Sequence, residues 1–249
     1  CPDTTLHLAV LDLGDLKAVK AFAADQAPSR LDILVNNAGL LPPLQRATTT
    51  DGFELKFGIN VLGHFALTEA LMPALACSEA PRVVWVSSLV HRRAQIDFED
   101  LNAGRDYDPQ RAYNQAKLAC LMLAMELHHR SRRTPPQLTA VAAHPGIAKT
   151  AIGRSRDGQR RAGIRDHLTD AAFWMAMNVF SQPQDVGARC LLQAAAGSNV
   201  QGGEFWGPDG FGEMRGAPTR VALSAPALDA DQRQRLWAAC AAMVSAIRR

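Results

Sequence analysis

The sequence predicts one α/β domain of the Rossmann type, with a doubly wound parallel sheet covered by helices on both faces. Short runs that are apolar throughout alternate with longer segments of helical spacing, as expected for strands buried on both sides. Polar or small residues follow these runs, at the strand ends where such sheets bind ligands. A length of 249 residues with 47% hydrophobic and 20% charged residues suits a single domain over residues 1–249.

The amino-acid composition argues against nucleic-acid binding, a metal site and a membrane segment. A net charge of +3 is too small to indicate nucleic-acid binding. The five cysteines are scattered without paired or metal-ligand spacing, which favours the reducing cytoplasm and no metal site. No apolar run approaches the ~20 residues of a membrane helix, so we expect no membrane segment.

The elements follow in order. Apolar runs predict strands at 6–13, 31–35, 82–87, 138–143 and 204–206, and apolar residues spaced three and four apart predict helices at 15–27, 52–77, 111–129, 168–180, 184–196 and 229–249. The chain begins at Cys1 and enters its first strand almost at once. We therefore expect that a preceding part of the protein, with any anchor or targeting signal, is absent from this sequence.

The strand ends carry the residues that suggest a site. Asp12, Asn37, Ser88 and Pro145 each stand at such an end. Because the carboxyl ends of parallel strands lie at one edge of the sheet, these residues are expected to meet there. The small residues after Asn37 suit close approach of a ligand, and suit a tight turn equally well.

Tyr113 and Lys117 lie four residues apart in the helix predicted at 111–129, on one face of it. A phenol has a pKa of about 10, and lowering it to about 7 requires ~4 kcal/mol. Lys117 and an oxidised nicotinamide could together supply this stabilisation. Ser88 cannot act as the base but can hold a substrate oxygen. Alone, the Tyr–Lys spacing is typical of a surface pair; the serine strand before it and Pro145-Gly146 after it favour catalysis.

Asn60 is a polar residue within an apolar helix. It must find partners there, either by bonding a bent helix backbone or by holding a water that leads to Lys117. His64 is expected to be a packed histidine rather than a catalyst.

These motifs resemble the short-chain dehydrogenase/reductase family, in the family's order and over most of the chain. The resemblance implies that Tyr113 is the general acid/base, assisted by Ser88 (preferred to Ser87), Asn60 and Lys117. It also implies a nicotinamide cofactor. Its binding residues would be Asp12 and Leu13 beside the adenine, Asn37, Ala38 and Gly39 on the adenosine side, Tyr113 and Lys117 at the ribose, and Pro145, Gly146, Ile147 and Thr150 around the nicotinamide and pyrophosphate.

Finer features resemble the retinol-dehydrogenase-like branch, notably the long Ser88-to-Tyr113 segment and the inserted residues 96–101. That branch implies a hydrophobic alcohol or carbonyl substrate and NADP(H), with NAD possible. Residues 173–177 could line the substrate pocket, although core packing is the commoner reason for such a stretch. The arginines at 154–165 could touch a phosphate, although a solvated loop is the commoner reason. A homo-oligomer through the helices at 52–77 and 111–129 is also implied.

One departure from the family concerns the glycine-rich turn that binds the pyrophosphate after the first strand. The glycine-rich stretch at 207–212 lies near the other end and has the wrong spacing. We therefore expect the first βαβ unit to be absent, which would expose two apolar edges in the sheet. The isolated chain should then be poorly stable and bind cofactor weakly.

The sequence leaves three hypotheses about the function of the protein. The leading hypothesis is an NAD(P)-dependent oxidoreductase, and the alternative is a non-catalytic remnant or binding module of the same fold. A serine hydrolase using Ser88 is disfavoured because no G-x-S-x-G elbow surrounds it.

Overall fold

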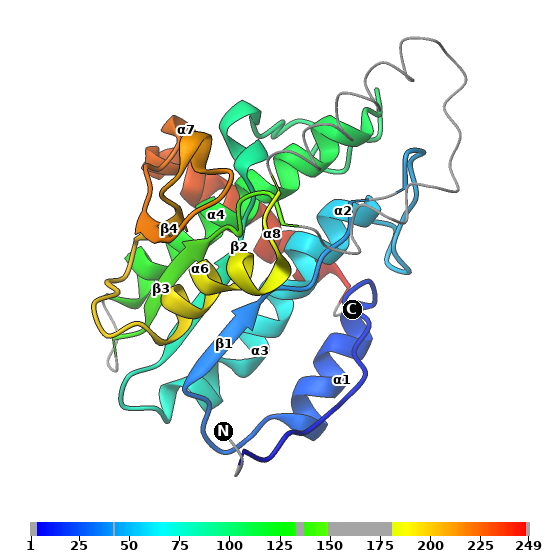
Figure 1. Cartoon of the computed structure of the whole chain (residues 1–249). Coiled ribbons are helices and arrows are strands. Elements are labelled where there is room, and N and C mark those ends of the chain that lie inside the picture. The colour runs from blue at the N-terminus through cyan, green and yellow to red at the C-terminus, as the bar shows by residue number, and fades with distance from the viewer. Residues whose placement is uncertain (1–3, 42, 133–136, 149–180, 248–249) are drawn as a thin grey trace.

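The computed structural model describes residues 4–41, 43–132, 137–148 and 181–247. Its sheet has the strand order β1-β2-β3-β4-β5 (Figure 1). The first four strands are parallel and β5 pairs antiparallel to β4. The strands are β1 (Ile33–Asn36), β2 (Arg82–Val86), β3 (Thr139–Ala143), β4 (Phe205–Pro208) and β5 (Pro218–Arg220).

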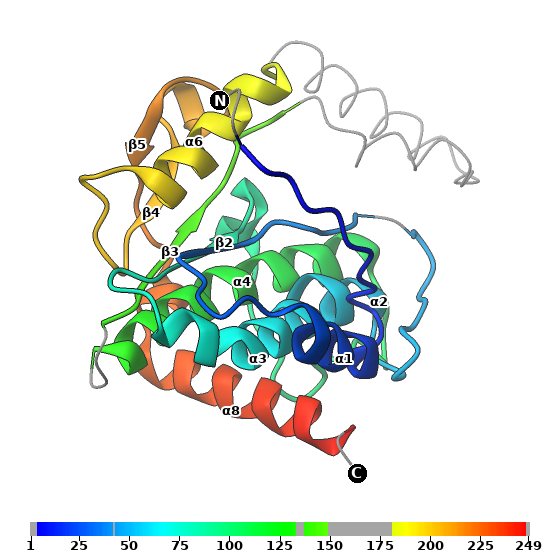
Figure 2. The same cartoon turned by 90° about the horizontal axis from the view of Figure 1, so that it is seen from below.

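Helices cover both faces of the sheet, which confirms the predicted α/β class. Figure 2 shows α3, α4 and α8 on one side and α6 on the other. The described helices are α1 (Leu16–Gln26), α2 (Leu55–Phe57), α3 (His64–Ala76), α4 (Pro109–Ser131), α6 (Gln184–Ala196), α7 (Ala225–Leu228) and α8 (Ala230–Ala246), with the π-helix η1 (Gly58–Gly63) and the 3₁₀ turns η2 (Leu89–Arg93) and η4 (Phe211–Glu213).

Alternate residues of the central strands divide the core in two. Trp85 of β2 and Ala142 of β3 pack in the larger cluster with α3, α4 and α8. Val84 and Val141 face the other way and pack with residues of α6. This alternation is the reason both strands read as apolar throughout.

Three of the described helices, α1, α4 and α8, begin at aspartate caps. Asp15 accepts hydrogen bonds from the first turn of α1, Asp108 accepts from Arg111 at the start of α4, and Asp229 caps α8. A carboxylate at this position satisfies backbone N–H groups and suits the positive end of the helix dipole. Pro109 is the first residue of α4, where a missing N–H is tolerated.

The prediction of a strand at residues 6–13 is wrong. Residues 4–12 form no regular element, and Leu6, Leu8 and Val10 are 90%, 99% and 96% exposed. A strand exists only through hydrogen bonds to a neighbour, and no described segment pairs with this one. Figure 2 shows it as a dark blue trace leading into α1.

The outer edge of β1 is open in the described part of the chain. No described strand pairs with that edge, and Ile33 and Val35 are 41% and 39% exposed. The expected exposure of apolar sheet edge is therefore observed at β1.

Two elements near the C-terminal end were not predicted. β5 and α7 lie in or just after the glycine- and proline-rich stretch, where residue type suggested only loop. The helix predicted at 168–180, the stretch 173–177 and the arginines at 154–165 lie outside the described residues.

The helix α8 covers α4 on the side away from the sheet (Figure 2). Leu236 and Cys240 of α8 are fully buried, and the Trp237 ring lies 4.8 Å from that of Phe65 on α3. The same surface of α4 is therefore not open to a second copy. Oligomerisation itself stays a prediction, but pairing through this surface would require α8 to move.

Among the described residues, one helical stretch, Leu55–Ala76, is long and apolar enough to cross a membrane, with a hydropathy of 1.3. Of the most apolar 18 residues in this stretch, 61% are buried inside the protein. A core helix passes the same test, and the packing of α3 under the sheet fits that role.

Candidate active site

The helix α4 brings Tyr113 and Lys117 to the carboxyl end of β2. The Lys117 ammonium lies 6.0 Å from the centre of the Tyr113 ring. Lys117 is only 5% exposed, and its Nζ donates to the Val86 carbonyl at 3.0 Å. An ammonium has three donors, and this is the single hydrogen bond that Nζ makes to a described residue. Two donors therefore remain for a ligand.

The two serines after β2 have different surroundings. Ser87 is buried and donates from Oγ to the Lys117 backbone carbonyl at 2.8 Å, which fastens α4 to β2. Ser88 is partly exposed, and its Oγ makes no hydrogen bond to another side chain or backbone group within the described part of the chain. Only Ser88 is thus open to a substrate oxygen.

The turn after Ser88 is fixed by a histidine. The Nδ1 of His91 donates to the Ser88 carbonyl oxygen at 2.7 Å, and its ring packs edge-on against Phe205 at 5.1 Å. Burial lowers the pKa of His91, so the ring is neutral. Because His91 contacts the carbonyl and not Oγ, it gives no support to a serine hydrolase.

Three side chains spaced four apart hold the loop after β1. His64 donates from Nε2 to the Ala38 carbonyl at 2.7 Å. Asn60 bonds the Leu40 backbone N–H and C=O at 2.9 and 3.0 Å. Lys56 donates to the Pro43 carbonyl at 2.8 Å. Residues i, i+4 and i+8 share one helix face, so a single stripe fixes the loop.

The Asn60 side chain therefore finds its partners in the loop after β1, and not in a bent helix backbone as one of the two expectations had it. Its helix is a π-helix at this point, and its own carbonyl accepts from the Cys120 thiol at 3.2 Å. π-Helical segments often mark functional positions. A water between Asn60 and Lys117 stays a prediction. His64 is buried, and burial lowers its pKa to about 4, which fits a packed neutral histidine.

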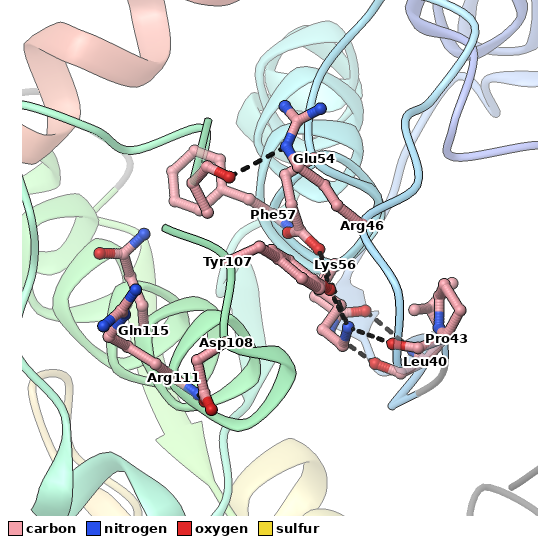
Figure 3. A network of polar contacts seen from close by, with 12 residues as sticks. Leu40, Pro43, Arg46, Glu54, Lys56, Phe57, Tyr107, Asp108, Arg111 and Gln115 are labelled. Carbon is pink, nitrogen blue, oxygen red and sulfur yellow. Dashed lines mark hydrogen bonds and ion pairs between the residues drawn. The ribbon is translucent and has the colours of Figure 1, made fainter. Parts of the chain in front are cut away.

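Lys56 was missed by sequence reasoning. It is fully buried, 2.5 Å from the Tyr107 hydroxyl, which in turn donates to Glu54 at 3.1 Å (Figure 3). Burial and the Glu54 charge raise the pKa of Tyr107, so its hydroxyl stays a donor. The spacing from Lys56 to Asn60 and His64 was the available signal, but a lysine in a helix is usually solvated.

Glycines leave room near the candidate catalytic side chains. A Cβ on Gly39 would lie 3.0 Å from Asn60 Oδ1 and 3.5 Å from Lys117 Nζ. Gly146 has φ +67°, and a Cβ there would collide with the Met214 carbonyl. Beside it, the Ile147 N–H donates to that carbonyl at 2.8 Å. Gly146 thus requires glycine for its backbone conformation and for space, whereas a side chain on Gly39 would crowd Asn60 and Lys117.

Asp12 and Leu13 do not stand at a strand end, which corrects the prediction. Asp12 is exposed and accepts from the Gly14 N–H at 2.7 Å in a turn before α1. Leu13 packs against Gly63 of η1. The N–H groups of the first turn of α1 are bonded by Asp15 and Asp51, so this helix start is not open to a pyrophosphate.

The other residues predicted to bind the cofactor form two groups, one after β1 and one after β3. Asn37, Ala38 and Gly39 follow β1, and Pro145, Gly146 and Ile147 follow β3, all at the carboxyl edge of the sheet. Thr150 lies outside the described residues. The residues present suit a nicotinamide and its ribose, because Lys117 has donors that no described residue uses and Gly39 leaves space beside it. No glycine-rich turn for a pyrophosphate occurs among the described strands and helices.

Comparisons with known proteins agree with this geometry. The family described as short chain dehydrogenase matches residues 3–161. Mouse retinol dehydrogenase 13 is 37% identical over 94% of this chain and 66% of that protein, and the human protein 36% over 94% and 67%. Mouse polyprenol dehydrogenase is 36% identical over 93% and 66%. The chain thus spans about two thirds of the length of these relatives.

Solved structures show the same fold. An uncharacterised protein from Mycobacterium paratuberculosis is 38% identical with a TM-score of 0.72, over 94% of this chain and 74% of that one. The NADPH-bound carbonyl reductase from chicken fatty liver is 22% identical with a TM-score of 0.50, over 78% and 71%, and shares the fold. The chain therefore belongs to the short-chain dehydrogenase family and is similar within it to retinol dehydrogenases.

Proposed function

We propose that the protein is an oxidoreductase that interconverts a hydrophobic alcohol and its carbonyl with a nicotinamide cofactor. The observation that carries this proposal is the face of α4, where Tyr113 and the buried Lys117 lie at the end of β2. There Lys117 Nζ donates to the Val86 carbonyl, and the open Ser88 is the second residue after Val86. An acid/base phenol, an ammonium and a hydroxyl donor are the groups that a carbonyl reduction requires.

In this proposal Tyr113 gives its hydroxyl proton to the carbonyl oxygen during reduction and takes it back during oxidation. Ser88 donates a hydrogen bond from Oγ to the same oxygen. Lys117 stabilises the phenolate by its charge, and its remaining donors bind the ribose. The nicotinamide, when bound, supplies or accepts the hydride. Asn37, Ala38, Gly39 and Pro145, Gly146, Ile147 border it on either side.

We propose NADP(H) as the cofactor, with NAD(H) as the alternative, and an apolar substrate. The similarity to retinol dehydrogenases and to a polyprenol dehydrogenase supports the substrate class, because both names specify apolar alcohols. We also propose a cytoplasmic location. Cys77, Cys120, Cys190 and Cys240 are all free thiols, as expected in a reducing compartment.

An activity screen tests the proposal. The purified chain, and the longest open reading frame that contains it, are assayed with NADPH and NADH against retinal, a steroid ketone and a simple aliphatic aldehyde. We expect turnover with an apolar carbonyl and a preference for NADPH. Cofactor binding without turnover of any of these substrates would support the alternative, a non-catalytic binding module.

A further inference from the structure

The glycine-rich stretch that begins at Gly207 has no role in the chemistry above. It forms the loop from β4 to β5, with the turn η4 at its tip. Gly212 and Glu213 are both left-handed, at φ +59° and +58°. This conformation costs a residue with a side chain ~1 kcal/mol or more. Non-glycine residues in it often serve a functional site, where the surroundings hold them.

The Glu213 carboxylate contacts the ends of two strands. One oxygen lies 3.0 Å from Nε2 of His144, the fully buried residue that follows β3 and precedes Pro145. The other accepts from the guanidinium of Arg92. Arg92 belongs to η2, which begins directly after Ser88. Glu213 thus joins the turn after the serine to the turn after β3.

The hydrogen bonds fix the tautomer of His144. The Gly146 N–H donates to Nδ1 at 3.2 Å, so Nδ1 carries no proton and Nε2–H donates to Glu213. Burial by itself raises the pKa of Glu213, but hydrogen bonding to His144 and the Arg92 charge outweigh it and lower that pKa overall. The carboxylate is therefore ionised at neutral pH and orients the ring, and the ring holds the Gly146 amide.

The same loop contacts the turn after β3 at further points. The Met214 carbonyl accepts from the Ile147 N–H at 2.8 Å. The Gly216 N–H donates to Gln182 Oε1 at 3.1 Å, and Gln182 Nε2 donates to the Pro145 carbonyl at 2.8 Å. Gly207 has no side chain where a Cβ would collide with His144. The loop therefore encloses His144 and the turn that follows it.

We propose that Glu213 is a positioning residue, which holds the turn at Pro145–Ile147 in place relative to Ser88 through His144 and Arg92. In this proposal the glycine-rich stretch at 207–212, which has the wrong spacing for a phosphate-binding turn, serves the nicotinamide side of the site. The catalytic consequence rests on the proposed function, whereas the positional claim can be measured without turnover.

Two variants and a matched control separate positioning from stability. Glu213→Gly removes the carboxylate but relieves the left-handed backbone, so its effect on unfolding is expected to be small. Glu213→Gln keeps an acceptor for His144 and loses the charge beside Arg92. The control is Glu204→Gln. Glu204 is also arginine-paired and similarly exposed, 15% against 17%, but it precedes β4 at the opposite end of the strand.

The first measurement is hydrogen exchange by mass spectrometry on peptides that cover residues 140–148 and 86–94. In Glu213→Gly, the amides of Gly146 and Ile147 should exchange about ten-fold faster, as expected when a charge-assisted hydrogen bond is lost. Glu213→Gln should lie between this variant and the wild type. Glu204→Gln should match the wild type in these peptides.

The second measurement is turnover of retinal with NADPH. Glu213→Gly should lower kcat by about ten-fold to a hundred-fold, the effect of small misplacement in an active site, with little change in KM for retinal. Unchanged exchange in residues 140–148, or equal changes in Glu213→Gly and Glu204→Gln, would overturn the inference. Faster exchange in a protein whose wild type does not turn over would reject the proposed function and support the inference.

Discussion

The carboxyl ends of β2 and β3 differ sharply from the outer edge of β1. At the former, Ser87, Lys117 and His144 are buried and each is bonded to backbone or carboxylate. At the latter, Val35 is exposed and Leu8 in the preceding segment is almost fully so. Both regions are rich in apolar residues. The difference shows that side chains, whether polar or apolar, are buried only where a neighbouring element supplies hydrogen bonds and a packing surface.

The two tyrosines of the chain provide the largest expected effect. Tyr113→Phe should lower kcat by at least about a hundred-fold, because general acid/base catalysis contributes that much or more. Its unfolding should be unchanged, since Tyr113 makes no hydrogen bond to the described residues. Tyr107→Phe should keep turnover and lose stability, because it removes a bond to both Lys56 and Glu54. Near-normal kcat in Tyr113→Phe would remove this residue from its role.

The buried Lys56 should have the largest effect on stability. Lys56→Met leaves Glu54 buried beside Tyr107 without its cation and should cost roughly 3–5 kcal/mol of unfolding free energy. Lys20→Met on the exposed side of α1 is the control, with a change within about 0.5 kcal/mol. Urea unfolding measures both. Equal midpoints for the two variants would show that the Lys56 network does not stabilise the loop.

The two serines should separate catalysis from packing. Ser88→Ala should reduce turnover with little loss of stability, because its hydroxyl is open. Ser87→Ala should cost about 0.5–1.5 kcal/mol, because it removes the buried hydrogen bond from Oγ to the Lys117 carbonyl. Thermal unfolding and steady-state rates on both variants distinguish them. The reverse pattern would assign the catalytic hydroxyl to Ser87.

The smallest effect is expected at the exposed N-terminal segment. Leu8→Ser should change the unfolding free energy by less than about 0.5 kcal/mol, whereas Leu118→Ala in α4 should cost about 2–5 kcal/mol. Leu8→Ser should also reduce self-association measured by sedimentation, because an exposed apolar segment favours aggregation. A large destabilisation by Leu8→Ser would mean that this segment packs in solution.

The local pattern of residues was sufficient for most of the fold. Residues 82–87 and 138–143 were correctly predicted as buried strands, and α6 and α8 as helices, because their apolar spacing and caps are local properties. Tyr113, Lys117 and Ser88 could be proposed as site residues for the same reason, since the helix spacing and the strand end are visible in the chain. The segment 6–13 has an equally strong apolar pattern but forms no strand.

Tertiary contacts decided the rest. A strand needs a partner, and sequence pattern does not say which edges of a sheet are paired. The stripe of Lys56, Asn60 and His64 acquires its role only because the loop after β1 folds over it. Glu213 and His144 are 69 residues apart in sequence, and nothing local joins them. The sequence by itself determined the family, the sheet class and the face of α4 that we propose to be catalytic, whereas only the structure could show which distant side chains hold that face in place, because such bonds depend on three-dimensional proximity.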